Sequence, residues 1–231
     1  MRSSKWSAHG NVYLLVDGER LTPERARELS RSEGSDGVIE ILERDGTEVT
    51  VAIWNPDGSR AEMSGNGTRI AGAWLAEAIG AAEVSVRVGD RTTHARVVGD
   101  RIEQALGSVV VEQPEVVDGI ELTPVSVGNP HAVVIGDPDE IERIGPLLEQ
   151  HPRFPTGTNV QVARVDGAGH VTARVWERGV GETASSGTSA VAVAAATHGD
   201  GEVAVAFPGG TLDVRLAAGE AFLTGPAERL D

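Results

Sequence analysis

The chain has 231 residues, of which 40% are hydrophobic, so it can bury a sizeable core and is long enough for one large domain or two smaller ones. No apolar run approaches the roughly 20 residues that span a membrane, and the first residues lack the apolar core of a secretory signal, so we expect a cytoplasmic protein. The formal net charge of −15 repels phosphate groups and there is no cysteine, so we expect no nucleic-acid partner, no membrane partner, no disulfide and no thiolate metal site.

Short runs rich in valine and isoleucine predict strands at 12–16, 49–54, 84–88 and 171–176. Four helices are predicted, at 22–31, 68–79, 137–150 and 187–197. The first begins with Thr22 as N-cap and Pro23 in its first turn, the second ends at Gly80, and the third contains Pro146, where we expect a kink or break. The fourth is almost entirely alanine and valine, so it belongs at the centre of a domain.

Three landmarks recur in the same order in the two halves of the chain. Their nearly constant separation argues against a chance origin, so we infer a gene duplication. We therefore predict two similar α/β domains, at 1–115 and 116–231, with a ligand cleft between them. The matching segments are 10–18 with 128–136 at a separation of 118, 37–41 with 159–163 at 122, and 53–55 followed by Ser64-Gly65 with 175–177 followed by Ser186-Gly187 at 122.

In each half a turn of small residues opens a helix, Ser64-Gly65-Asn66 in the first and Ser186-Gly187-Thr188 in the second. Backbone N–H groups at a helix N-terminus lack intrahelical partners and attract anions, and glycine allows close approach. Two such ends facing one another would grip one carboxylate from both sides. Taken alone, each turn is better explained by serine and glycine as ordinary N-cap and turn residues, but their recurrence favours the anion site.

Several segments resemble the signature segments of the diaminopimelate epimerase family. The resemblance runs from Gly10-Asn11 to residues 223–227, and family members are usually longer, which implies shorter connecting loops here. It implies an α/β fold of two pseudo-symmetric domains, each a β-barrel-like sheet around a central helix, and a homodimer. The segments are NPDGS at 55–59, EMSGNG at 62–67, GNPH at 128–131, TNV at 158–160 and WERGVGET at 176–183.

The family reaction implied by this resemblance is a PLP-independent epimerisation of L,L-diaminopimelate to meso-diaminopimelate, in the route to lysine and peptidoglycan precursors. One thiolate removes the α-proton and a thiol on the opposite face delivers another. The two catalytic positions lie directly before Gly65 and Gly187, and here they are Ser64 and Ser186. Because a serine hydroxyl is a far weaker acid than a thiol with a pKa of about 8.5, an unassisted serine is a poor base for this step.

A serine becomes competent when a neighbouring base assists it. His131 is the candidate helper, and His9, Glu177 and Glu182 are further candidates, although none has a diagnostic spacing. Three explanations of the two serines are open: an inactivated version of a cysteine enzyme, a related amino-acid racemase or dehydratase, and a protein that binds an amino acid without turning it over. We rank the family activity first because the substrate-binding residues are kept.

The resemblance also implies a binding shell for a small diamino-dicarboxylic acid. The two helix N-termini suit the reacting carboxylate, Arg178 suits the distal carboxylate and Glu177 the distal ammonium, although a Glu-Arg neighbour pair is also typical of a solvated surface. Gly37 stands where some family members carry a glutamine that approaches substrate. The shell consists of Asn11, Asn55, Gly65, Asn66, Asn129, Asn159, Glu177, Arg178, Gly187 and Thr188.

No metal and no organic cofactor is predicted. The six histidines are dispersed, and the sequence contains neither a P-loop nor a dinucleotide-binding glycine-rich turn. The competing class is a non-catalytic binding protein, which would bind a diamino acid without exchanging its α-proton. A serine hydrolase is not favoured, because neither Ser64 nor Ser186 has the glycine two positions earlier that a nucleophile elbow requires.

Overall fold

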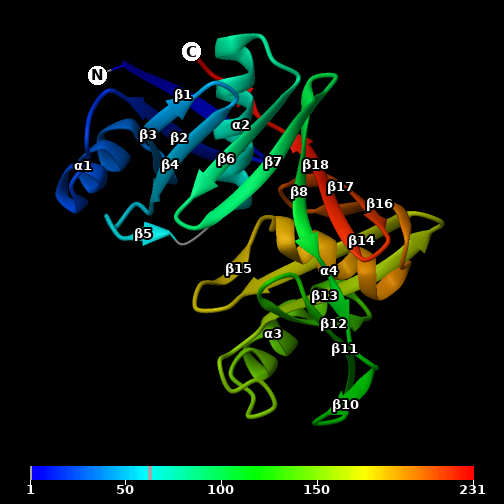
Figure 1. Cartoon of the computed structure of the whole chain (residues 1–231). Helices are drawn as coiled ribbons and strands as arrows, with labels where there is room; N and C mark the ends of the chain where they lie inside the picture. Colours follow the sequence, from blue (N-terminus) through cyan, green and yellow to red (C-terminus); the bar gives the residue numbers. More distant parts are fainter. Residues whose placement is uncertain (1, 62–63) are drawn as a thin grey trace. The chain divides into compact units, whose positions relative to one another are not determined.

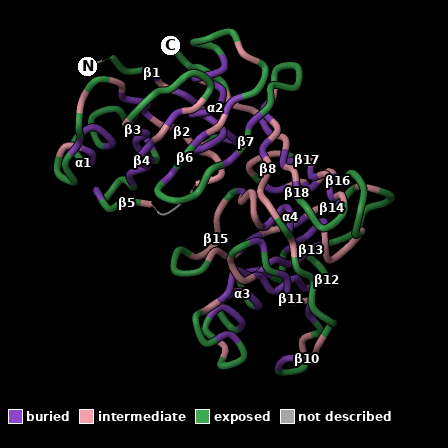
Figure 2. Tube along the Cα trace, viewed as in Figure 1, coloured by how far each residue is buried: buried purple, intermediate pink, exposed green. Residues whose placement is uncertain are grey.

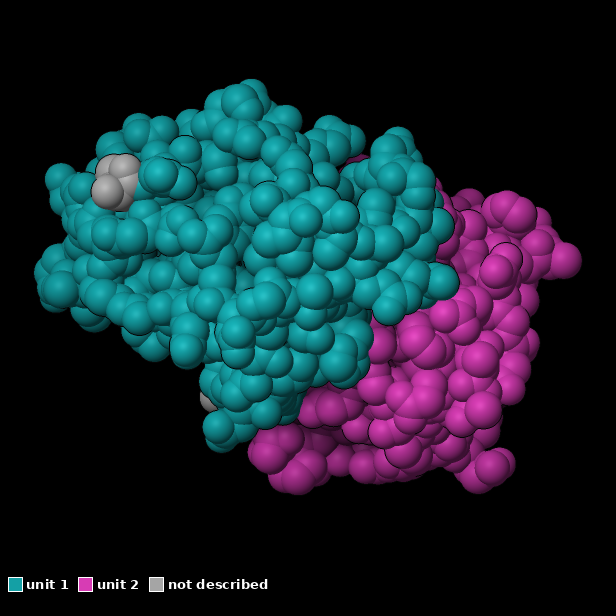
Figure 3. All heavy atoms as spheres, turned by 45° about the horizontal axis from the view of Figure 1, so that its top comes forward, with its two compact units in different colours: residues 1–104, 224–231 teal, residues 105–223 magenta. Residues whose placement is uncertain are grey.

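The computed structural model describes residues 2–61 and 64–231 (Figure 1). Glu62 and Met63 of the EMSGNG segment lie outside the described residues. The chain forms two compact units, unit 1 with residues 1–104 and 224–231 and unit 2 with residues 105–223 (Figure 3). This division differs from the predicted boundaries of 1–115 and 116–231, because unit 1 ends earlier and includes the last residues of the chain.

Unit 1 is a curved sheet around one helix, α2 (Gly65–Ile79), which packs against strands on several sides. The strand pairs β2–β3 and β4–β6 are parallel, and the other described pairs of this unit are antiparallel. Its other elements are β1 (Arg2–Ala8), β2 (Asn11–Asp17), α1 (Pro23–Glu33), β3 (Gly37–Asp45), β4 (Glu48–Trp54), β5 (Arg60–Ala61), β6 (Glu83–Val88), β7 (Arg91–Val98), β8 (Arg101–Ser108) and β19 (Glu228–Arg229).

The helices of unit 1 begin and end where local chemistry directs. Thr22 caps α1 by accepting from the Arg25 N–H, and α1 ends at Glu33, after which the C-cap residue Gly34 has a left-handed φ of 60°. Helix α2 ends before Gly80 as predicted, but it begins at Gly65 and not at residue 68, because the Ser64 side chain already caps the first turn.

Unit 2 is likewise a curved sheet around one helix, α4 (Gly187–Thr197), whose bounds are those predicted. No residue of α4 is exposed, as its apolar sequence indicated (Figure 2). The other elements are β9 (Val110–Val111), β10 (Glu115–Val117), β11 (Ile120–Ser126), β12 (Pro130–Ile135), η1 (Pro138–Glu140), α3 (Ile141–Glu149), β13 (Asn159–Gly167), β14 (His170–Glu177), β15 (Gly181–Thr183), β16 (Gly201–Phe207), β17 (Gly210–Ala217) and β18 (Glu220–Pro226), whose last three residues belong to unit 1.

The predicted helix at 137–150 consists of the 3₁₀ turn η1 followed by α3. Of the kink or break expected at Pro146, the break does not occur, since α3 continues through this residue to Glu149. Ile141, Ile144 and Leu148 keep one face of α3 in a buried cluster, and this packing outweighs the backbone hydrogen bond that proline removes.

The strand register reproduces the sequence duplication. In the parallel pair β2–β3, Tyr13 lies opposite Gly37, and in the parallel pair β12–β13, His131 lies opposite Asn159. These are the positions that the separations of 118 and 122 bring into correspondence. The two-repeat α/β fold is therefore confirmed. The following antiparallel pairs agree, with Val38 opposite Trp54 and Val160 opposite Trp176.

Candidate active site

In unit 1, Ser64 lies at the N-terminus of α2 within a set of polar contacts. Its Oγ accepts from the Gly67 N–H at 3.0 Å and lies 3.1 Å from Tyr13 Oη. A Cβ added at Gly65 would meet no described protein atom within 4 Å. Because the first N–H groups of a helix lack intrahelical acceptors, this open turn can receive an anion.

Asn66 links this turn to the start of β2. Its Nδ2 donates to Asn11 Oδ1 at 2.8 Å, and its Oδ1 accepts from Arg69 Nη2 at 2.6 Å. Arg69 is fully buried and its Nε donates to the Pro226 carbonyl at 2.9 Å. Burial lowers the pKa of Arg69 to about 10, so the guanidinium stays charged at neutral pH. Arg69 therefore fixes which way the Asn66 amide points.

Asn11 and Asn55, two asparagines of the predicted binding shell, each lie next to a turn in unit 1. His9 and Gly10 have φ values of 50° and 79°, which form the tight hairpin turn that directs the chain into Asn11. Asn55 is exposed and closes a separate turn, since its Nδ2 donates to Ser59 Oγ at 2.9 Å. No hydrogen bond among the described residues connects Asn55 with Ser64.

In unit 2, Ser186 holds the corresponding place before α4. Its backbone is extended, with φ −147°, but its side chain makes no capping hydrogen bond. Asn129 Nδ2 lies 3.4 Å from Thr188 Oγ1 and donates to it, which repeats the Asn11–Asn66 contact of unit 1. In each unit, an asparagine at the start of β2 or just before β12 is thus hydrogen-bonded to a residue in the first turn of the central helix.

His131 orients Asn129. The imidazole is 1% exposed, with Nδ1 3.0 Å from Gln161 Nε2 and Nε2 2.9 Å from Asn129 Oδ1. Because an amide nitrogen only donates, Nδ1 accepts and Nε2–H donates to Asn129. Burial lowers the pKa of His131 to about 3. With both nitrogens engaged and so low a pKa, His131 is poorly suited to the helper-base role predicted for it.

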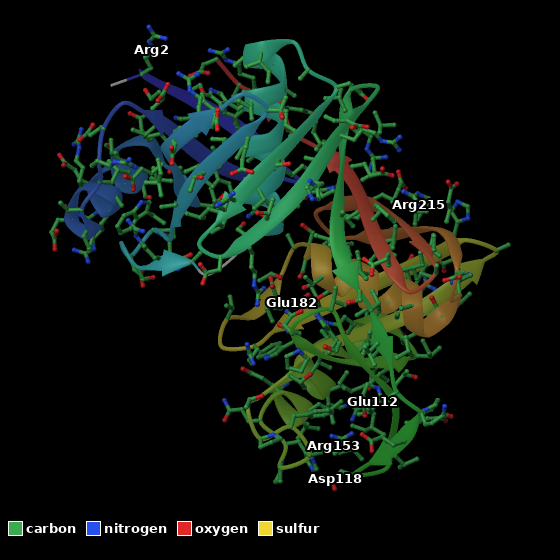
Figure 4. The ribbon with its side chains drawn as sticks, in the orientation of Figure 1. Arg2, Glu112, Asp118, Arg153, Glu182 and Arg215 are labelled. Carbon is green, nitrogen blue, oxygen red and sulfur yellow. The ribbon has the colours of Figure 1, made fainter. Side chains whose placement is uncertain are left out.

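The two glutamates considered as helpers also have other partners. Glu182 on β15 is labelled in Figure 4. It forms a bidentate ion pair with Arg174, with N–O distances of 2.6 and 2.8 Å. Glu177 accepts from the Thr183 hydroxyl at 2.5 Å. Neither carboxylate forms a hydrogen bond to Ser186 among the described residues.

The loop after β14 is held by two anchors. Asn159 Oδ1 accepts from the Arg178 N–H at 3.1 Å. Glu149 accepts from the Gly179 N–H at 2.7 Å and from Trp176 Nε1 at 2.8 Å, and these bonds, in that order, hold the pKa of its carboxyl below the ordinary value. The Arg178 side chain is exposed, and its Nη1 donates to the Thr156 carbonyl at 3.1 Å.

Sequence reasoning missed several residues that support these sets. Tyr13 was discernible because it occupies the repeat position of His131, and Arg69 because it is a charged residue near the start of a mostly apolar helical stretch. Gln161 and Glu149 carry no such signal, because their contacts come from the folded chain. In the described part of the chain, no group of three or more His, Asp or Glu side chains could hold a metal ion. No described helix is long and apolar enough to cross a membrane.

Solved structures with the same fold are epimerases and related proteins. A predicted epimerase from Pseudomonas aeruginosa matches with a TM-score of 0.75 at 14% identity, covering 100% of this chain and 97% of that one. A hydroxyproline epimerase from Agrobacterium vitis matches with a TM-score of 0.66 at 15% identity, covering 99% of this chain and 90% of that one. At these identities the likeness shows the fold alone.

The sequence comparisons reach further. The sequence model of the family described as diaminopimelate epimerase matches residues 4–112 and 123–230. The diaminopimelate epimerase of Synechocystis sp. is 35% identical over 268 aligned positions, which cover 98% of this chain and 96% of that protein. That of Desulforudis audaxviator is also 35% identical, with 100% and 97% covered. The chain therefore belongs to the diaminopimelate epimerase family, a family of isomerases.

Proposed function

We propose that this protein epimerises L,L-diaminopimelate to meso-diaminopimelate without PLP, in the route to lysine and peptidoglycan precursors. The observation that carries the proposal is the repeated pairing of an asparagine with a helix N-terminus, Asn11 with Asn66 and Asn129 with Thr188. Inversion needs an acid–base group on each face of one carbon, and a duplicated site supplies two.

The proposed roles follow from the charges of the substrate. The N–H groups that begin at Gly65 and Gly187 bind the reacting carboxylate and stabilise the negative charge that develops beside it. Arg178 binds the distal carboxylate and Glu177 the distal ammonium. Ser64 and Ser186 face the α-carbon and transfer its proton.

The serines also favour a second candidate, a homologue that binds the amino acid without turning it over. Ser186 has no capping contact and no carboxylate partner among the described residues, so nothing described assists its ionisation. A related racemase or dehydratase reaction is a further alternative, since a probable proline racemase shares the fold.

The test is α-deuterium incorporation into L,L- and meso-diaminopimelate in D₂O, by this chain and by the double variant Ser64→Cys, Ser186→Cys. Exchange by the unchanged chain means that the serine pair works. Exchange only in the double variant means an epimerase scaffold with its chemistry switched off, and we expect a gain of at least about 100-fold in that variant.

Ser32→Cys is the matched control, because it adds a thiol at an exposed position of helix α1, and we expect no gain from it. Binding of either isomer without exchange in any variant would support the binding protein. Absence of both binding and exchange would contradict the proposed substrate.

A further inference from the structure

We propose that Tyr13 is the acid–base partner of Ser64 and acts through its hydroxyl, so that the pair replaces one thiol of the family reaction; this rests on the function proposed above. Tyr13 Oη lies 3.1 Å from Ser64 Oγ. The Gly67 N–H donates to the same Oγ at 3.0 Å, so the serine is held between the helix N-terminus and the phenol.

The phenol supplies the acidity that serine lacks. A tyrosine has an ordinary pKa of about 10, close to the value of about 8.5 for a thiol, whereas a serine hydroxyl almost never ionises in water. Burial lowers the pKa of Arg69, and the charge of an ionised Tyr13 raises it. Because that attraction is mutual, the buried guanidinium also favours the phenolate.

The step balances without any other reactant. The phenolate of Tyr13 takes the hydroxyl proton of Ser64 while Ser64 Oγ takes the α-proton of the substrate. The Cα–H bond breaks, an Oη–H bond forms, and the electron pair stays on the α-carbon beside the carboxylate. In the reverse direction the phenol proton returns to the α-carbon through Ser64.

The fold alone does not impose this contact. Tyr13 lies opposite Gly37, and a Cβ at Gly37 would lie 2.7 Å from Tyr13 Cε1, so the glycine makes room for the ring. In unit 2 the same register places His131 opposite Asn159, and Ser186 makes no side-chain cap. The hydroxyl pair therefore occurs in only one of the two described repeats.

Tyr13 is the only tyrosine in the chain, so every phenol signal reports on it. We expect Tyr13→Phe to reduce α-deuterium exchange at least about 100-fold. Replacing tyrosine throughout with 3-fluorotyrosine, whose phenol is more acidic, should move the pH profile of exchange to lower pH by as much as it moves the phenol absorbance titration. Unchanged exchange in Tyr13→Phe, or an unmoved profile, would overturn the proposal.

The absorbance titration adds a readout that needs no turnover. Ser64→Ala removes a hydrogen bond to the phenolate, so the midpoint should rise by about one pH unit, whereas Ser186→Ala should leave it in place. A titration midpoint that is the same in Ser64→Ala as in the unchanged chain would overturn the proposed pairing of Tyr13 with Ser64. If the unchanged chain is silent but the double cysteine variant exchanges, the pairing fails and the proposed epimerase scaffold stands. If both are silent, both proposals fail.

Discussion

The two repeats share a backbone but differ in the chemistry around their serines. Unit 1 sets a phenol, Tyr13, against Ser64 and leaves the facing strand position to Gly37. Unit 2 has His131 and Asn159 at the matching positions, which hold amides and backbone in place and form no hydrogen bond to Ser186 among the described residues. The two units have kept the same strand register, while the side chains at the matching positions and their hydrogen bonds differ.

The largest expected difference between the two units is in how their stability responds to acidic pH. His131 has a folded-state pKa of about 3, against about 6.5 in an unfolded chain. Between these values the unfolded chain binds a proton that the folded chain refuses, so stability present above pH 6.5 is lost as the pH falls toward 3. In that window we expect His131 to lower the free energy of unfolding by about 1.4 kcal/mol for each unit by which the pH falls. An ordinary tyrosine, as at position 13, does not titrate there.

Urea unfolding at pH 6 and pH 4.5 measures this loss. His131→Phe keeps an aromatic ring and removes the titration, so its loss should be smaller by about 2 kcal/mol, whatever its stability at neutral pH. Equal losses in the two proteins would show that His131 is not buried in the neutral form.

A second difference concerns the room for a side chain at Gly37, the strand position opposite Tyr13. In Gly37→Ala the new Cβ would lie 2.7 Å from Tyr13 Cε1 and 2.8 Å from the Trp54 carbonyl, so we expect a loss of about 1–3 kcal/mol in urea unfolding. Adding Tyr13→Ala should recover part of that loss. Gly167→Ala in β13 is the matched control, because a Cβ added there meets no described atom within 4 Å, and we expect no comparable loss. A Gly37→Ala protein as stable as the parent would contradict the crowding.

The smallest difference is in the response to salt. Unit 1 has 14 basic and 19 acidic residues, whereas unit 2 has 6 and 16. In unit 2, Arg153 and Glu112, both labelled in Figure 4, form an ion pair, and the same arginine also pairs with Glu115. Because salt screens repulsion between exposed charges, raising NaCl from about 0.1 to 1 M should stabilise unit 2 more than unit 1, by less than about 1 kcal/mol. Amide hydrogen exchange resolved by unit measures this, and an equal gain would contradict it.

The sequence was sufficient for features encoded locally or by repetition. Gly80 ends α2, the apolar run forms α4, and the landmarks correspond in strand register. It was insufficient where distant residues decide. Packing carries α3 through Pro146, and burial turns His131 from a plausible base into a support for Asn129.

The same limit applies to the ends of unit 1. The return of residues 224–231 depends on β19 pairing with β1, where Trp6 lies opposite Arg229. Both pairing segments are short and neither carries a sequence signal for the other, so the break between the halves could not be placed from the chain alone.

That return has a consequence for synthesis on the ribosome. Unit 2 is one continuous segment, so all of its residues have been translated before those of unit 1 are complete. Until residues 224–231 have been translated, unit 1 lacks the Pro226 carbonyl, which accepts a hydrogen bond from Arg69. It also lacks strand β19, which pairs with β1. The N-terminal unit is therefore the one that finishes last, contrary to the usual order of domain folding during translation.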